Sequence, residues 1–217
     1  MKSAKKAIIA ALCAVMLVVG SVAGTMAYLT STDEVVNTFT VGNVQIKLDE
    51  ANANADGKPV NNEGTEVELA AAPRVTSNRY KLMPGHTYIK DPTIHVDSTS
   101  EKCWLFVKVE DGIATIEDNK TIATQMSEKG WTLVSGETNV YAYRSIANAS
   151  DNISVFDGFK LKGDANISTY ANAQIKVTAY AVQANGFTTA ADAWAAAPAT
   201  WTTPAAPDAP DAPEETV

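Results

Sequence analysis

The sequence contains very little cysteine, and its only long hydrophobic run lies near the N-terminus. Of the two cysteines, Cys13 lies within that run and Cys103 lies in the middle of the chain. If the N-terminal run is removed, Cys103 has no partner, which excludes an intramolecular disulfide. The folded domain must then be held together by core packing, and we expect Cys103 to be a buried small hydrophobic residue rather than a reactive thiol or an intermolecular link.

Motifs of catalysis and metal binding are also lacking. We find no zinc-protease motif, no nucleophile elbow, no glycine-rich phosphate loop and no metal-spaced set of cysteines and histidines. The only two histidines, His86 and His95, would need a third ligand such as Asp91 or Asp97 to hold zinc. Histidines on a turn and on a strand surface are the simpler interpretation. We therefore predict no catalytic residue, no cofactor and no metal site.

The charge balance is acidic. The first 27 residues contain three lysines and no acidic residue, so the rest of the chain has 14 basic and 25 acidic side chains, a formal net charge of −11. A surface of this sign repels phosphate backbones and anionic lipids. Nucleic acid is therefore excluded as a partner, and a membrane is expected to be contacted only through an uncleaved N-terminal segment.

The N-terminus has the organisation of an export signal. Three lysines precede an uncharged, mostly apolar run over residues 7–19, and small residues follow as far as Ala27. This order predicts a signal peptide over residues 1–27, with cleavage between Ala27 and Tyr28. The run is shorter than the ~20 apolar residues of a membrane span. We therefore expect a secreted protein.

The remaining chain shows the two-residue alternation of strands, separated by turn residues. Strands are predicted over residues 38–48, 103–110 and 173–184, a hairpin over residues 131–144, and short helices over residues 118–129 and 188–197. Many short strands, few helices and no strand–helix–strand repeat predict an all-β fold with minor α content. We expect an antiparallel, jelly-roll-like β-sandwich with one or two short helices over residues 28–203.

Several local features are predicted within this domain. Residues 51–64 are expected to form a long polar loop, and Pro84-Gly85 a type II turn. Asp118 or Asn119 is expected to cap the first helix. A second turn is expected at Asp157-Gly158. The acidic, proline-rich residues 204–217 are predicted to be disordered.

Several segments together resemble the TasA and camelysin family of secreted proteins from Gram-positive bacteria, whose precursors are cut by a SipW-type signal peptidase. The resemblance lies in residues 24–33 (GTMAYLTSTD), 37–46 (NTFTVGNVQI), 82–85 (LMPG), 90–94 (KDPTI), 104–109 (WLFVKV), 131–133 (WTL) and 141–143 (YAY). It implies a jelly-roll domain, processing by that peptidase, a location on the cell surface or in the biofilm matrix, and assembly into fibres. In such fibres the N-terminal segment of one subunit is thought to complete the sheet of the next.

Residues 28–41 fit the role of a donated strand. Val35, Phe39 and Val41 lie on one face of an extended segment, and each would stabilise a contact by roughly 1.5–3 kcal/mol if fully buried. The alternative is that this segment pairs within its own sheet as an edge strand. The leading functional prediction is a non-enzymatic structural protein that assembles head-to-tail.

Two functions from other classes stay open from the sequence. One is a secreted metallopeptidase of the camelysin kind, which would have to use His86 and His95. The other is a surface adhesion module that uses exposed aromatic residues such as Trp131, Tyr141 and Tyr143, although these residues also suit a core role.

Overall fold

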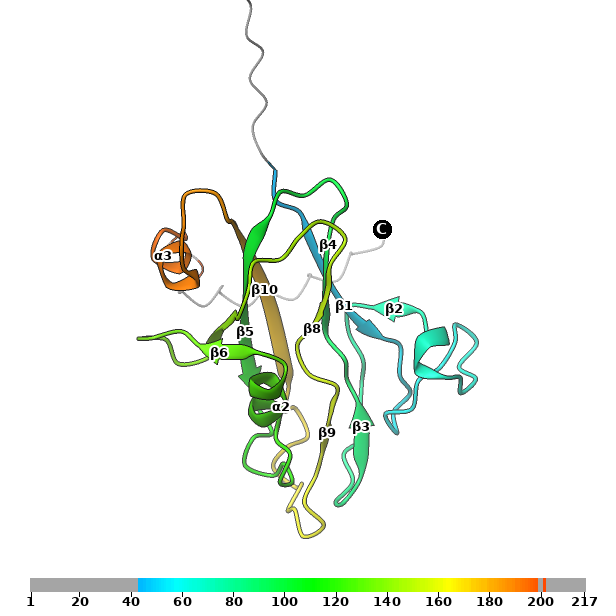
Figure 1. Ribbon diagram of the computed structural model, residues 1–217. Coiled ribbons are helices and arrows are strands. Elements are labelled where there is room, and N and C mark those ends of the chain that lie inside the picture. Colours follow the sequence, from blue (N-terminus) through cyan, green and yellow to red (C-terminus); the bar gives the residue numbers. More distant parts are fainter. Residues whose placement is uncertain (1–42, 199–200, 202–217) are drawn as a thin grey trace, which may run out of the picture. The chain divides into compact units, whose positions relative to one another are not determined.

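The computed structural model describes residues 43–198 and residue 201. The predictions for the signal peptide, for the segment 28–41 and for the tail 204–217 lie outside these residues. In the described part, antiparallel sheets carry almost all of the regular structure and only two short α-helices are present (Figure 1). The predicted all-β class with minor α content is confirmed.

The first sheet has four strands in the order β2-β1-β4-β8. Their bounds are β1 Ile46–Ala51, β2 Arg74–Val75, β4 Thr93–Val96 and β8 Asn152–Ser154. A smaller ladder of β3 (Thr87–Ile89) and β9 (Gly158–Lys160) continues the β4–β8 ladder in the same register. Backbone bonds across the interruption, such as Val155 N to Pro92 O at 2.8 Å, link the two ladders. The predicted turn at Asp157-Gly158 is therefore wrong. The chain does not reverse there, because β8 and β9 follow one another in the same direction along the segment that contains β3 and β4.

The second sheet also has four strands, in the order β10-β5-β7-β6. Their bounds are β5 Cys103–Asp111, β6 Trp131–Leu133, β7 Val140–Tyr143 and β10 Ile175–Gln183. All nine residues of β5 face all nine residues of β10. The two strands predicted here and the predicted β6–β7 hairpin are confirmed.

The main core lies between the two sheets. The first sheet contributes Ile94 and Val96, and the second contributes Leu105, Val107 and Val109, all of them buried. Cys103 is fully buried in the same row, as predicted for a small hydrophobic residue. Because alternate residues of both sheets point inward, the domain is a β-sandwich.

A second cluster covers the other face of β5. Trp104 and Phe106 pack there against Trp194 of helix α3 (Ala190–Ala195), with ring centroids of Phe106 and Trp194 4.9 Å apart. Thr189 caps α3 by accepting a hydrogen bond from Asp192 N. β5 is therefore buried on both faces, whereas its alternation had suggested only one buried face.

Helix α2 (Ile122–Glu128) begins later than predicted. Thr121 is its cap and accepts a hydrogen bond from Thr124 N at 3.2 Å. The predicted caps are wrong because the Asp118 carboxylate instead accepts from Asn119 N and pairs with Lys160 at 2.8 Å.

The polar loop after β1 is more regular than its composition suggested. Asn54 and Asn61 each accept hydrogen bonds from two backbone amides of the following residues, which closes two successive turns. The short helical turn η1 (Leu69–Ala71) follows them. The predicted type II turn at Pro84-Gly85 is confirmed by a positive φ of 75° at Gly85 and by the bond from His86 N to Met83 O.

Candidate functional site

The long strand β10 has one edge without a partner among the described residues. The bonds Gly112 N to Gln174 O and Ala184 N to Lys102 O show that even-numbered residues of β10 exchange hydrogen bonds with β5. In an antiparallel pair the backbone groups of the alternate residues point the other way. The odd-numbered residues from Ile175 to Gln183 therefore direct their N–H and C=O groups away from β5. No described residue bonds to these groups.

The first half of β1 also has an edge without a backbone partner among the described residues. Asp97 N donates to Gln45 O at 3.0 Å, so odd-numbered residues of β1 bond to β4. The backbone groups of Ile46 and Leu48 then point to the opposite side. Strand β2 covers that side only from Glu50 onward, and nothing in the described part of the chain bonds to Ile46 or Leu48.

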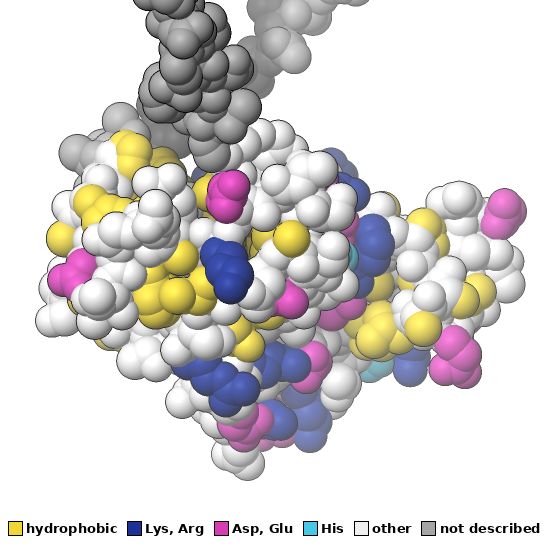
Figure 2. All heavy atoms as spheres, turned by 45° about the horizontal axis from the view of Figure 1, so that its top comes forward, with side chains coloured by type: hydrophobic (Ala, Val, Ile, Leu, Met, Phe, Trp, Pro, Cys, Tyr) yellow, Lys and Arg dark blue, Asp and Glu magenta, His cyan; other side chains and the backbone are white. Residues whose placement is uncertain are grey.

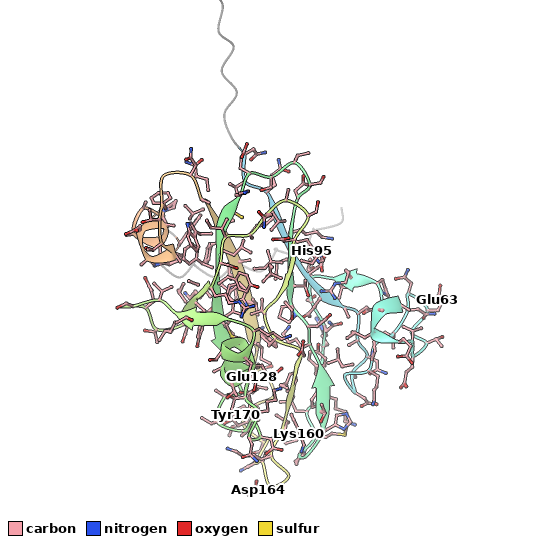
Figure 3. The ribbon with its side chains drawn as sticks, viewed as in Figure 1. Glu63, His95, Glu128, Lys160, Asp164 and Tyr170 are labelled. Atoms are coloured by element: carbon pink, nitrogen blue, oxygen red, sulfur yellow. The ribbon has the colours of Figure 1, made fainter. Side chains whose placement is uncertain are left out.

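A groove of about 910 Å³ lies between these two strands. Its apolar lining includes Leu48, Tyr80, Phe159, Ile175 and Val177. Tyr170, another lining residue, lies at the end of the fold opposite the start of β1 (Figure 3). Several of these side chains pack against the core and stay only partly buried. The groove is thus an extension of the core that the described residues leave uncovered.

The groove rim carries basic side chains. Arg79, Lys81 and Lys176 line it and are exposed, and none of them lies within 4.0 Å of a carboxylate of the described residues. The acidic lining residue Glu50 is already engaged, because it pairs with Lys90 at 2.5 Å. On the face of the molecule in Figure 2, by comparison, acidic and basic side chains lie close to one another.

A buried ionic network fixes the wall of the groove formed by β1 and β2. Arg74 donates from Nε to Asp49 at 2.7 Å and from Nη1 to Asp91 at 2.6 Å. Burial alone would raise the pKa of Asp49, but hydrogen bonds from Arg74, Lys47 and His95 hold it below its ordinary value. The network therefore keeps Asp49 ionised and attaches the two-residue strand β2 to β1.

His86 and His95, the two histidines considered as zinc ligands, have different partners in the structure. His86 Nε2 donates to the carbonyl oxygen of Asp56 at 2.8 Å, whereas His95 Nε2 lies 2.8 Å from Asp49 Oδ1. Asp91 is bound to Arg74, and Asp97 accepts from Thr99 within its own turn. Among residues 43–198 and 201 no group of three histidine, cysteine or acidic side chains is arranged to hold a metal ion.

Of the aromatic residues considered for an adhesion surface, Trp131 is part of the core, and Tyr141 and Tyr143 are partly buried against it. Trp131 is 2% exposed, and its Nε1 donates to Ser154 O at 3.0 Å. Tyr143 packs on Trp131 with ring centroids 5.1 Å apart, and Tyr141 is half-buried against the main core. Trp131 is therefore not available for an exposed binding surface, whereas Tyr141 and Tyr143 are only partly buried.

A pair of acidic residues, the half-buried Asp111 and the buried Glu117, lies next to the groove and was not found from the sequence. Asp111 accepts from the amide of Ile113, a groove-lining residue, at 3.0 Å. Glu117 is 3% exposed and accepts from the amide of Ile122 at 3.2 Å. Burial, together with the neighbouring Asp111, raises the pKa of Glu117 to about 7. Asp111 ends β5 and Glu117 lies six residues further on, after a turn, so no regular sequence pattern signals their contact.

The residues predicted to be functional lie outside the described part of the chain. These are Ala27 and Tyr28 at the expected cleavage site, and Val35, Phe39 and Val41 of the expected donor segment. The structure instead provides a groove that the sequence did not predict. The individual strands were predictable, but their open edges follow only from the pairing.

The fold and the groove define a class of protein, an antiparallel β-sandwich in which one long strand edge has no partner among the described residues. Comparisons with family models, with curated proteins and with solved structures found no match. No helix among the described residues is long and apolar enough to cross a membrane. We therefore base the functional proposal on the groove and on the N-terminal sequence.

Proposed function

We propose that this chain is an exported, non-enzymatic structural protein of a bacterial cell surface or biofilm matrix. In this proposal its copies assemble head-to-tail, and residues 28–41 of one copy add a strand in the groove of the next. The observation that carries the proposal is the edge of β10, which no residue in the described part of the chain pairs, beside a groove with a partly buried apolar lining. The resemblance of the N-terminal residues to the TasA and camelysin family supports the same function.

The contrast between β10 and the other sheet edges favours pairing with another strand. Exposed edges attract further strands, and proteins usually keep them short or covered. The edge strands β2 and β6 have two and three residues. The β8–β9 edge is covered by side chains, because Trp131 donates to Ser154 O and Gln125 donates to Gly158 O. The nine-residue edge of β10 has no such protection among the described residues and contains no proline.

The segment 28–41 has the chemistry that this groove requires. Its apolar residues Val35, Phe39 and Val41 share one face, which would cover the apolar lining. Main-chain hydrogen bonds to the open edge of β10 would add affinity, as in other cases of strand addition. Because the segment and the groove are different surfaces of one copy, each bound copy leaves one segment and one groove for further copies.

The first experiment compares purified protein that starts at Tyr28 with protein that starts at Gly42. We expect the longer form to assemble into filaments or oligomers, seen by electron microscopy and light scattering, and the shorter form to stay monomeric. Circular dichroism of both forms checks that the sheets are intact. Equal assembly of the two forms would refute strand donation.

A complementation experiment separates donation to a neighbour from pairing within one chain. Phe39→Glu disables the donor segment, and Val177→Lys disables the groove. Each variant alone is expected to be monomeric, whereas a mixture should form one-to-one dimers that cannot extend. Pairing within one chain predicts monomers in the mixture as well. Thr38→Glu and Thr178→Lys, on the opposite faces of the same segments, serve as matched controls.

A further inference from the structure

The groove rim differs in charge from the chain as a whole. Arg79 and Lys81 flank Tyr80 on one wall, and Lys176 lies near the start of β10 on the other. All three are exposed and have no carboxylate within 4.0 Å among the described residues. On a chain that carries a net charge of −11 after residue 27, this gives a local site for an acidic partner.

The donor segment has matching charges in one place. Asp33 and Glu34 are its only charged residues, and they directly precede the apolar residues that begin at Val35. Successive side chains of an extended strand point to opposite faces. Asp33 would therefore lie on the same face as Val35 and Phe39, and Glu34 on the opposite face, so an added strand would carry one carboxylate on each face.

We propose that Arg79, Lys81 and Lys176 recognise Asp33 and Glu34 of the incoming copy and thereby fix which part of its N-terminal segment enters the groove. This inference rests on the proposed function. Apolar contacts and main-chain bonds tolerate a shift of two residues along a strand, because such a shift keeps the same face inward. Such a shift would separate the charged pairs at one end of the groove. The basic rim is thus a determinant of register and of partner choice.

Local attraction also offsets a general repulsion. Two copies that each carry −11 repel one another at low ionic strength. Pairing of the rim with Asp33 and Glu34 places opposite charges together at the point of contact. Each exposed pair contributes little by itself, roughly a two- to fivefold change in association. We expect the loss of two pairs and their replacement by repulsion to weaken association at least tenfold.

The test is a charge exchange in the protein that starts at Tyr28. Arg79→Glu/Lys81→Glu should weaken assembly at least tenfold, measured by light scattering against protein concentration. Asp33→Lys/Glu34→Lys should weaken it as much. The variant that combines both pairs of substitutions should recover most of the assembly. The control Lys58→Glu/Lys102→Glu changes the net charge equally at exposed lysines that do not line the groove, and it should assemble nearly as the parent does.

The outcomes separate this inference from the proposed function. If Phe39→Glu abolishes assembly but the rim variants assemble normally, the charge recognition is refuted and strand donation stands. The same holds if Phe39→Glu abolishes assembly and the combined variant does not recover it. If Phe39→Glu assembles normally, the donation itself is refuted. Arg79→Gln/Lys81→Gln provides a milder change, and circular dichroism confirms that each variant is folded. Loss of assembly in the lysine control as large as in the rim variant would show a net-charge effect and also refute the recognition.

Discussion

Replacement of Glu117 by glutamine should change how the stability of this protein depends on pH. Glu117 is buried beside Asp111, and its pKa is raised from the ordinary 4.5 to about 7. A folded-state pKa above the unfolded one means that the folded protein binds this proton more tightly. The stabilisation from that proton is complete below pH 4.5 and is lost as the pH rises through 7.

The size of the effect follows from the shift. A raised pKa of 2.5 units corresponds to about 3 kcal/mol, shared between Glu117 and its partner Asp111. The parent protein should therefore lose about 3 kcal/mol of unfolding free energy between pH 4.5 and pH 8 through this pair. Asp49, Asp97 and Asp118 have lowered pKa values, so their contributions change at more acidic pH and do not mask the effect.

Glu117→Gln imitates the protonated acid. Its amide oxygen can still accept from Ile122 N, and its NH2 group can donate to Asp111, so no buried group loses its partner. We expect the variant to show a much flatter pH profile and to be more stable than the parent at pH 8, in urea unfolding followed by tryptophan fluorescence from pH 5 to 8.5. Glu128→Gln, which changes an exposed carboxylate paired with Lys120, should keep the parent profile. A Glu117→Gln profile as steep as that of the parent would show that Glu117 and Asp111 do not share a proton.

Three further predictions concern the ionic network of Arg74, the cap of α2 and the buried Cys103. Arg74→Ala leaves the buried Asp49 and the neighbouring Asp91 without their shared cation. We expect the free energy of unfolding in urea to fall by about 2 kcal/mol, less than for a fully buried ion pair because Arg74 is partly exposed. An unchanged unfolding midpoint would contradict the role of this network. Thr121→Ala removes the cap of α2 and should cost about 1 kcal/mol, seen as a lower melting temperature, whereas Asn119→Ala should have little effect. Burial raises the pKa of the Cys103 thiol to about 11. The folded protein should therefore not react with a thiol reagent at pH 8 until denaturant is added. Rapid labelling without denaturant would be inconsistent with this burial.

Much of the fold could be predicted from local sequence, because β5 and β10 alternate strongly and are long. Residues 103–110 and 173–184 were predicted as strands and form β5 and β10. The caps were less predictable. Asp118 is as good a cap as Thr121 by residue type, and only its tertiary ion pair with Lys160 removes it from the helix end. The broken β3–β4 and β8–β9 ladder likewise depends on a register that one strand alone does not define.

The candidate site depends on long-range pairing to a greater degree. Leu48 and Val177 lie in segments predicted as strands, and both pack toward the core. Which of their neighbours keep free backbone groups depends on the partner strands, whose residues Ile94 and Val109 lie far away in the sequence. Asp111 and Glu117 illustrate the same limit, because two scattered acidic residues gain an unusual pKa only through the folding that buries them.

The position of the donor segment next to the export signal gives the proposed assembly a natural control. Residues 28–41 follow directly on the predicted cleavage site, so in the precursor their N-terminal end is still joined to the apolar run over residues 7–19. A segment held in this way cannot be threaded freely along the β10 edge of another copy. Cleavage between Ala27 and Tyr28 would release the end. The same step that completes export would then make the segment available, which confines assembly to the outside of the cell and protects the open β10 edge from pairing during synthesis.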